Sequence, residues 1–88
     1  MKTKLYRILT EHKNYNGIQS LVYLYFPYGA SIYFGKGLWN GVDEASLTIE
    51  VQGLNLSAKV RKLAKAIKTL NKQEAVLVQW FDIHGEFV

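Results

Sequence analysis

The residue types that could carry out catalysis are present in this chain, but they form no recognisable catalytic pattern. His12 and His84 lie far apart in the sequence, whereas a metal site usually needs three or more ligands held close together. Asp43 and Glu44 are adjacent at an expected turn, where solvation explains them without acid–base work. The sequence contains no cysteine, which excludes thiolate catalysis, disulfides and iron–sulfur clusters. We therefore expect a protein that is not an enzyme and that holds neither a metal ion nor a cofactor.

A short aromatic and basic stretch is the best candidate for ligand binding. Tyr33, Lys36 and Trp39 are close in sequence, so rings that could stack on a nucleobase accompany an ammonium group that could neutralise a phosphate. The alternative is an edge strand with a bulge at Gly35 and Gly37, whose aromatic side chains fill a core or a subunit interface.

A basic helix face is the second candidate. Placing the residues from Ser57 onward at helical intervals puts Arg61, Lys65, Lys68 and Lys72 on the side opposite the apolar stripe. The net charge of +4 also favours an anionic partner. We expect Arg61 and Lys65 to give electrostatic support to an anionic ligand; the alternative is a solvated face that keeps the protein soluble.

Nucleic acid is not the favoured partner. RNA-recognition domains carry a basic, Gly and aromatic run on their third strand, whereas residues 45–51 read Ala-Ser-Leu-Thr-Ile-Glu-Val. Glu50 would repel phosphate at the place where RNA should lie.

Six segments with strand or helix periodicity follow one another along the chain. The clearest strand alternates apolar and polar residues over 45–51, and Asn40-Gly41 before it is typical of a tight hairpin turn. Residues 16–26 have helical spacing, with Asn14 or Asn16 as the cap, although the same residues also suit a buried strand. In order, the predicted elements are a strand at 4–11, a helix at 16–26, strands at 30–39 and 45–51, a helix at 57–71 and a strand at 75–83.

This order predicts the fold class and the position of one polar pair. Two right-handed crossover units in tandem give an α+β, ferredoxin-like β-α-β-β-α-β sandwich, in which two helices cover one face of a four-stranded antiparallel sheet. Residues 1–88 would form one domain, because a chain of this length supports one hydrophobic core. The first and third strands would be central, so Thr48 and Glu50 should lie on the uncovered face beside a first-strand residue such as Arg7.

Three family resemblances accompany this fold. Val51-Gln52-Gly53-Leu54 resembles the Val-Gln-Gly-Val loop of acylphosphatases, although here it follows the third strand and Ser57 stands where that family has its phosphate-binding arginine. The strand order and the hairpin from Tyr33 to Trp39-Asn40-Gly41 resemble those of the PII and CutA proteins. This resemblance implies an oligomer and, in the case of PII, nucleotides bound between subunits. The segments 46–50 and 73–78, with Trp39-Asn40-Gly41, are similar to small bacteriophage proteins.

The functional prediction combines these observations. We expect a non-enzymatic homo-oligomer that binds an anionic small molecule such as a nucleotide, in the manner of a phage protein that sequesters a host signal. The predicted site residues are Tyr33, Lys36, Trp39, Arg61 and Lys65. The alternative is a phage-encoded inhibitor or adaptor that acts on a host protein or on a nucleic-acid-binding enzyme. No stretch is apolar enough to cross a bilayer, so a cytoplasmic location is expected without membrane attachment.

Overall fold

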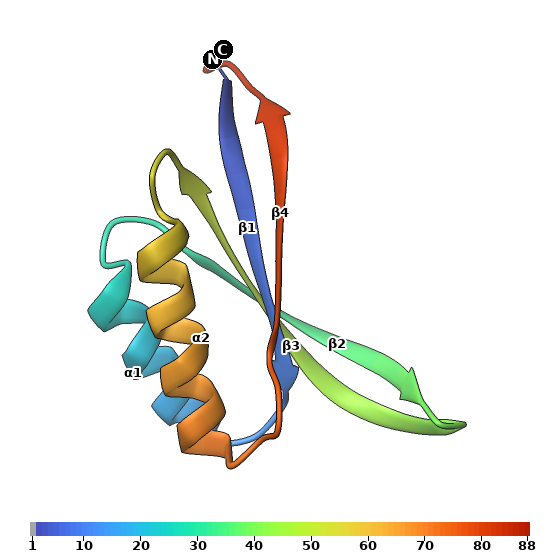
Figure 1. Ribbon diagram of the computed structural model, residues 1–88. Helices are drawn as coiled ribbons and strands as arrows, with labels where there is room; N and C mark the ends of the chain where they lie inside the picture. Colours follow the sequence, from blue (N-terminus) through green and yellow to red (C-terminus); the bar gives the residue numbers. More distant parts are fainter. Residues whose placement is uncertain (1) are drawn as a thin grey trace.

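The computed structural model describes residues 2–88 and contains the six predicted elements in the predicted order (Figure 1). Its strands and helices alternate as a β-α-β-β-α-β unit, which confirms the ferredoxin-like α+β class. Neither helix is long and apolar enough to cross a membrane within this described range. The elements are β1 (Lys2–Glu11), α1 (Tyr15–Tyr25), β2 (Ser31–Trp39), β3 (Val42–Gly53), α2 (Ser57–Asn71) and β4 (Leu77–His84).

The four strands form one antiparallel sheet in the order β2-β3-β1-β4. The first and third strands are therefore central, as predicted. In the register of this sheet Arg7 pairs with Glu50 on one side and with Gln79 on the other. These three residues consequently share one face, because directly opposed residues of antiparallel strands point the same way.

The core lies between one sheet face and the two helices, which pack side by side across it (Figure 1). The alternate residues of β1 and β3 that point toward the helices are buried, and their neighbours in sequence lie on the uncovered face. Each helix contributes its apolar stripe. The buried apolar residues are Tyr6, Ile8, Ile18, Val22, Phe26, Leu47, Ile49, Val51, Val60, Leu63, Ala64 and Ile67.

The segment predicted as a helix at 16–26 forms α1 over Tyr15–Tyr25, which resolves the alternative of a buried strand. Ile18 and Val22 reach the core from it. Asn14 occupies the cap position in the left-handed region (φ 51°), but its side chain makes no cap hydrogen bond. Its Nδ2 instead donates to the carbonyl oxygen of Leu70, at 3.3 Å, so this side chain ties the start of α1 to the end of α2.

The β2–β3 hairpin turns at Asn40-Gly41, as predicted, and projects beyond the helices (Figure 1). Asn40 and Gly41 have φ values of 49° and 76°, the left-handed pair that a type I′ turn requires. The bulge expected at Gly35 and Gly37 is absent, because pairing runs without interruption from Ser31 with Glu50 to the turn. Gly35 instead accommodates a close approach: a Cβ there would lie 3.0 Å from the Ser46 hydroxyl oxygen.

Candidate functional site

The uncovered face of the sheet carries a charged pair at its centre. Arg7 comes from β1 and Glu50 from β3, and the Arg7 Nε donates to a Glu50 carboxylate oxygen at 2.5 Å. The Arg7 guanidinium also lies 5.0 Å from the centroid of the Phe81 ring on β4, within cation–π range. This pair lies where strand alternation predicted it.

Four further side chains complete a shallow depression of about 440 Å³ around the pair. Leu9 of β1 and Thr48 of β3 stand one pleat along from Arg7 and Glu50, so the central strands supply four of the lining residues. The edge strands close its two sides, with Tyr33 on β2 opposite Thr48 and Gln79 on β4 opposite Arg7. The depression thus combines an aromatic ring, a hydroxyl, an amide and an ion pair on a rigid sheet.

The lining of the depression is close to electrically neutral. It contains one cation, Arg7, and one carboxylate, Glu50, and these two are already paired. The Glu50 side chain is 19% exposed and that of Arg7 40%, so the pair is only partly open to solvent. A hydrogen bond between ionised groups holds both side chains in place. The site therefore suits a ligand with hydrogen-bonding groups and little net charge.

Apolar side chains surround the depression on the same face. Leu5 faces Phe81 across the β1–β4 pair, and Leu9 faces Leu77. Leu77 is 52% exposed and Phe81 39%. Apolar surface that remains uncovered on one face of a sheet is typical of a contact surface between chains.

Tyr33 is the predicted binding residue that lies in this depression. Lys36 is on the opposite face of β2, because it lies three positions after Tyr33 and successive strand residues alternate between faces. Its Nζ lies 3.1 Å from an Asp43 carboxylate oxygen. Trp39 ends β2 opposite Val42, and its side chain falls outside the part of the structure that is described.

Arg61 and Lys65 lie on α2, on the helix-covered side of the sheet. Both border a second depression between α2 and the segment that leads into β4. Within one chain the structure thus brings these two cations together but separates them from Tyr33. That these five residues bind one ligand stays a prediction. Such a site would require side chains from more than one protomer.

Sequence reasoning did not select most of the residues that line the depression. Arg7, Thr48 and Glu50 were expected on the uncovered face but were not considered a binding site, and Leu9 and Gln79 were not singled out. The signal that could have found them is the period-two alternation of the strands, combined with the knowledge of which face lacks helices.

No protein-family model matches the chain, and no curated protein matches its sequence. Solved structures do match its fold over nearly the whole length. A phage SAM (S-adenosylmethionine) lyase in its apo state gives a TM-score of 0.70 at 19% identity, covering 97% of this chain and 91% of that one. The phage SAM lyase in complex with S-methyl-5'-thioadenosine gives 0.68 at 18%, covering 98% and 92%.

A nitrogen regulatory PII-like protein, CPII from Thiomonas intermedia K12, is also similar. Its complex with ADP, AMP and bicarbonate gives a TM-score of 0.65 at 17% identity, covering 100% of this chain and 98% of that one. The fold is PII-like. The expected resemblance to small PII-type proteins is therefore confirmed at the level of architecture.

The expectation that the chain is not an enzyme is wrong, because the grounds given for it do not exclude catalysis. That expectation rested on the lack of a catalytic sequence motif in a small ferredoxin-like chain. A phage SAM lyase has the same fold over nearly the same length. Small size and a PII-like sandwich are thus compatible with catalysis, and we do not retain the non-enzymatic interpretation.

Proposed function

We propose that this chain is an enzyme that acts as a homo-oligomer, binds S-adenosylmethionine in the depression on the uncovered sheet face, and cleaves it to S-methyl-5'-thioadenosine. The observation that carries the proposal is the near-neutral, partly aromatic lining built around the Arg7–Glu50 pair. The similarity to the phage SAM lyase supports the choice of ligand, because its complex holds that same adenosine product.

Charge favours this ligand over a nucleoside polyphosphate. S-adenosylmethionine combines a neutral nucleoside with a sulfonium cation and a zwitterionic amino acid group, whereas ATP brings several negative charges. The lining offers ATP one cation, and that cation already donates to Glu50. A polyphosphate would have to displace the carboxylate or leave its own charges poorly compensated, and either change costs binding free energy.

The lining residues have distinct roles in this proposal. The ring of Tyr33, with the side chain 53% exposed, offers a face on which adenine can stack. Thr48 and Gln79 offer neutral donors and acceptors for the ribose hydroxyls and the adenine edge. Glu50 offers an acceptor for the ligand's ammonium group, and Arg7 holds that carboxylate in place.

The cleavage step converts a charged sulfur into a neutral one. The bond between sulfur and the γ-carbon of the amino acid side chain breaks, and its electron pair stays on sulfur, which leaves the neutral thioether of S-methyl-5'-thioadenosine. The γ-carbon gains a bond to the ligand's own carboxylate oxygen, so a lactone of the four-carbon amino acid forms and no outside reactant is consumed. Because positive charge at sulfur disappears, apolar surroundings that exclude water favour the transition state over the charged reactant.

The proposed assembly supplies those surroundings. In a single chain the depression is open. Leu9 lines it, and Leu5, Leu77 and Phe81 border it on the uncovered sheet face. A second copy placed over this apolar border would exclude water and enclose the ligand at the contact between protomers. We propose that this enclosed state, in the cytoplasm, is the active one.

The test is to incubate the purified chain with S-adenosylmethionine and to measure S-methyl-5'-thioadenosine by liquid chromatography and mass spectrometry. Wild type should form this product. Glu50→Gln should lower kcat/KM roughly tenfold or more, the loss that follows from removing a hydrogen bond between charged groups. Glu44→Gln is the matched control, because Glu44 lies on the same strand but outside the depression. Product formation that is absent in wild type, or equal in the two variants, would rule the proposal out.

A second candidate is an oligomeric nucleotide-binding protein. Exposed cations on α2, with Arg61 and Lys65 side by side, favour it, as does the similarity to a PII-like protein bound to ADP and AMP. This candidate predicts that ATP or ADP raises the melting temperature by an amount that follows RT ln(1 + [L]/Kd). It also predicts that Arg61→Gln with Lys65→Gln abolishes the rise, whereas Glu50→Gln leaves it unchanged.

A further inference from the structure

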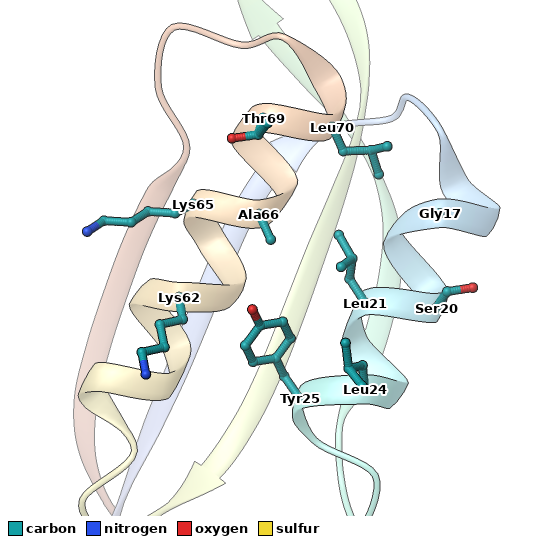
Figure 2. Close-up of a pocket in the computed structure, with 10 residues that line it drawn as sticks. All are labelled: Gly17, Ser20, Leu21, Leu24, Tyr25, Lys62, Lys65, Ala66, Thr69 and Leu70. Carbon is teal, nitrogen blue, oxygen red and sulfur yellow. The ribbon is translucent and has the colours of Figure 1, made fainter.

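A groove runs between α1 and α2 on the outer side of the helix layer, away from the sheet. Its volume is about 760 Å³. Figure 2 shows Leu21 and Tyr25 projecting from α1 toward α2, with Ala66 facing them. The lining residues are Gly17, Ser20, Leu21, Leu24, Tyr25, Lys62, Lys65, Ala66, Thr69 and Leu70.

The groove exposes apolar side chains that the core does not use. Leu24 is 73% exposed and Leu70 38%, although both belong to helices whose other faces are buried. Gly17 keeps the two helices close at one end, because a Cβ there would lie 2.9 Å from a methyl carbon of Leu70. The close approach of the helices thus leaves a groove between them, and leucine side chains lie along it.

The charges around this groove have a single sign. The helix α2 carries five cations (Lys59, Arg61, Lys62, Lys65 and Lys68), and neither helix contains a carboxylate. Among residues 2–88 no carboxylate lies within ion-pair distance of Lys62 or Lys65, the two cations that border the groove. The groove therefore presents apolar surface beside uncompensated positive charge.

We propose that this groove binds an amphipathic α-helix of a partner protein, with leucine-like side chains on one face and carboxylates beside them. A trough between two helices accepts a third helix, because helices pack with their axes about 8–10 Å apart and their side chains interdigitate. The 11 residues of α1 span about 16 Å, which matches three turns of such a helix. The partner's carboxylates meet Lys62 and Lys65.

The length of the positive surface decides between this partner and a smaller ligand. Lys59 continues the positive surface of Lys62 and Lys65 about one turn of α2 beyond the groove, whereas Arg61 and Lys68 border the depression on the other side of α2. A small anionic molecule in the groove would use only Lys62 and Lys65, whereas a helix lying along the groove also reaches Lys59. The groove is also independent of the proposed catalytic site, since it lies on the other side of the sheet and stays accessible when the uncovered face is closed.

The probe is a fluorescein-labelled synthetic helix of 16 residues, with leucine at spacings i, i+3, i+4 and i+7 and glutamate at most other positions. Fluorescence anisotropy at low salt should show saturable binding to the full chain. A peptide of the same composition in scrambled order, which has no apolar face, should bind at least tenfold more weakly. Equal binding of the two peptides, or no binding of the first, would overturn the proposal.

Variants then locate the binding surface. Leu24→Gln and the double change Lys62→Glu with Lys65→Glu should each weaken binding at least tenfold, and they alter exposed side chains that the fold does not need. Leu54→Gln and Lys72→Glu are matched controls outside the groove and should bind as wild type does. A peptide with lysine in place of glutamate should bind the charge-reversed variant better than it binds wild type.

A membrane surface is the competing occupant, and the same variants exclude it. Sedimentation with vesicles of phosphatidylglycerol and phosphatidylcholine should show no co-sedimentation at physiological salt. Strong vesicle binding that Leu24→Gln and Lys62→Glu abolish, together with weak peptide binding, would overturn the proposal in favour of a lipid partner.

Discussion

At the scale of single residues, the Arg7–Glu50 pair organises the uncovered face. Strand alternation was enough to predict this pair, because Glu50 belongs to the strand with the clearest period of two. The same alternation places Lys36 on the opposite face from Tyr33. The prediction that these two residues share a site considered only that they are close in sequence. The chemical character of each residue follows from the sequence. Which side chains meet in one site depends on strand register and on which sheet face the helices cover.

A second ion pair gives a prediction about pH. The Lys4 Nζ lies 2.7 Å from an Asp82 carboxylate oxygen, which joins β1 to β4 near the chain ends. The hydrogen bond from Lys4, and then its charge, lower the pKa of Asp82 below the ordinary value of 3.8. The same hydrogen bond and charge from Asp82 raise the pKa of Lys4 above 10.5.

The sign follows from these two directions. The Asp82 contribution is present above the unfolded pKa of the carboxyl and is lost as pH falls through the lower folded value. The Lys4 contribution is present below 10.5 and is lost as pH rises through the higher folded value. Asp82→Asn should therefore lower the melting temperature slightly at neutral pH and low salt, and this difference from wild type should shrink as pH falls below 3.8. A difference that does not shrink on acidification would contradict this assignment, as would one that is insensitive to salt.

At the scale of elements, local pattern predicted most boundaries. The helix predicted at 57–71 is found at Ser57–Asn71, because its apolar stripe is long and regular. The helix α1 begins at Tyr15, one residue before the predicted start, but Asn14 before it uses its side chain on the other helix instead of capping its own. Contacts between elements far apart in sequence leave no local signal, and a buried polar cluster at this end of the sandwich is the clearest example.

Asn71 is the centre of that cluster. It is 4% exposed, and its Nδ2 donates to Thr10 Oγ1 at 3.2 Å and to Gln73 Oε1 at 2.8 Å. Its Oδ1 accepts from Asn14 Nδ2 at 3.1 Å. One side chain thus joins the end of β1, the start of α1 and the end of α2.

Asn71→Ala should lower the free energy of unfolding by about 1–3 kcal/mol, because it leaves buried polar groups without partners. Urea unfolding monitored by circular dichroism measures the change. Asn16→Ala is the control, since Asn16 is exposed on α1 and its replacement should stay within about 0.5 kcal/mol of wild type. Similar effects of the two substitutions would show that the cluster does not stabilise the fold.

At the scale of the whole molecule, the sandwich presents two unlike surfaces. The uncovered sheet face is apolar around a neutral polar depression, and the helix layer is cationic around an apolar groove. The order of elements predicted this architecture. Function was harder to predict, because a site made of neutral residues and one ion pair on a sheet has no sequence motif. That residues 1–88 form one domain stays a prediction.

The proposed function requires that the adenosine ligand binds on the uncovered face of the sheet. Titration of the ¹⁵N-labelled chain with S-methyl-5'-thioadenosine, followed by amide chemical shifts, locates that binding surface. We expect saturable shifts at Tyr33, Thr48, Glu50 and Gln79, with the amides of α2 largely unmoved. Shifts confined to α1 and α2, or no shifts at millimolar ligand, would contradict it.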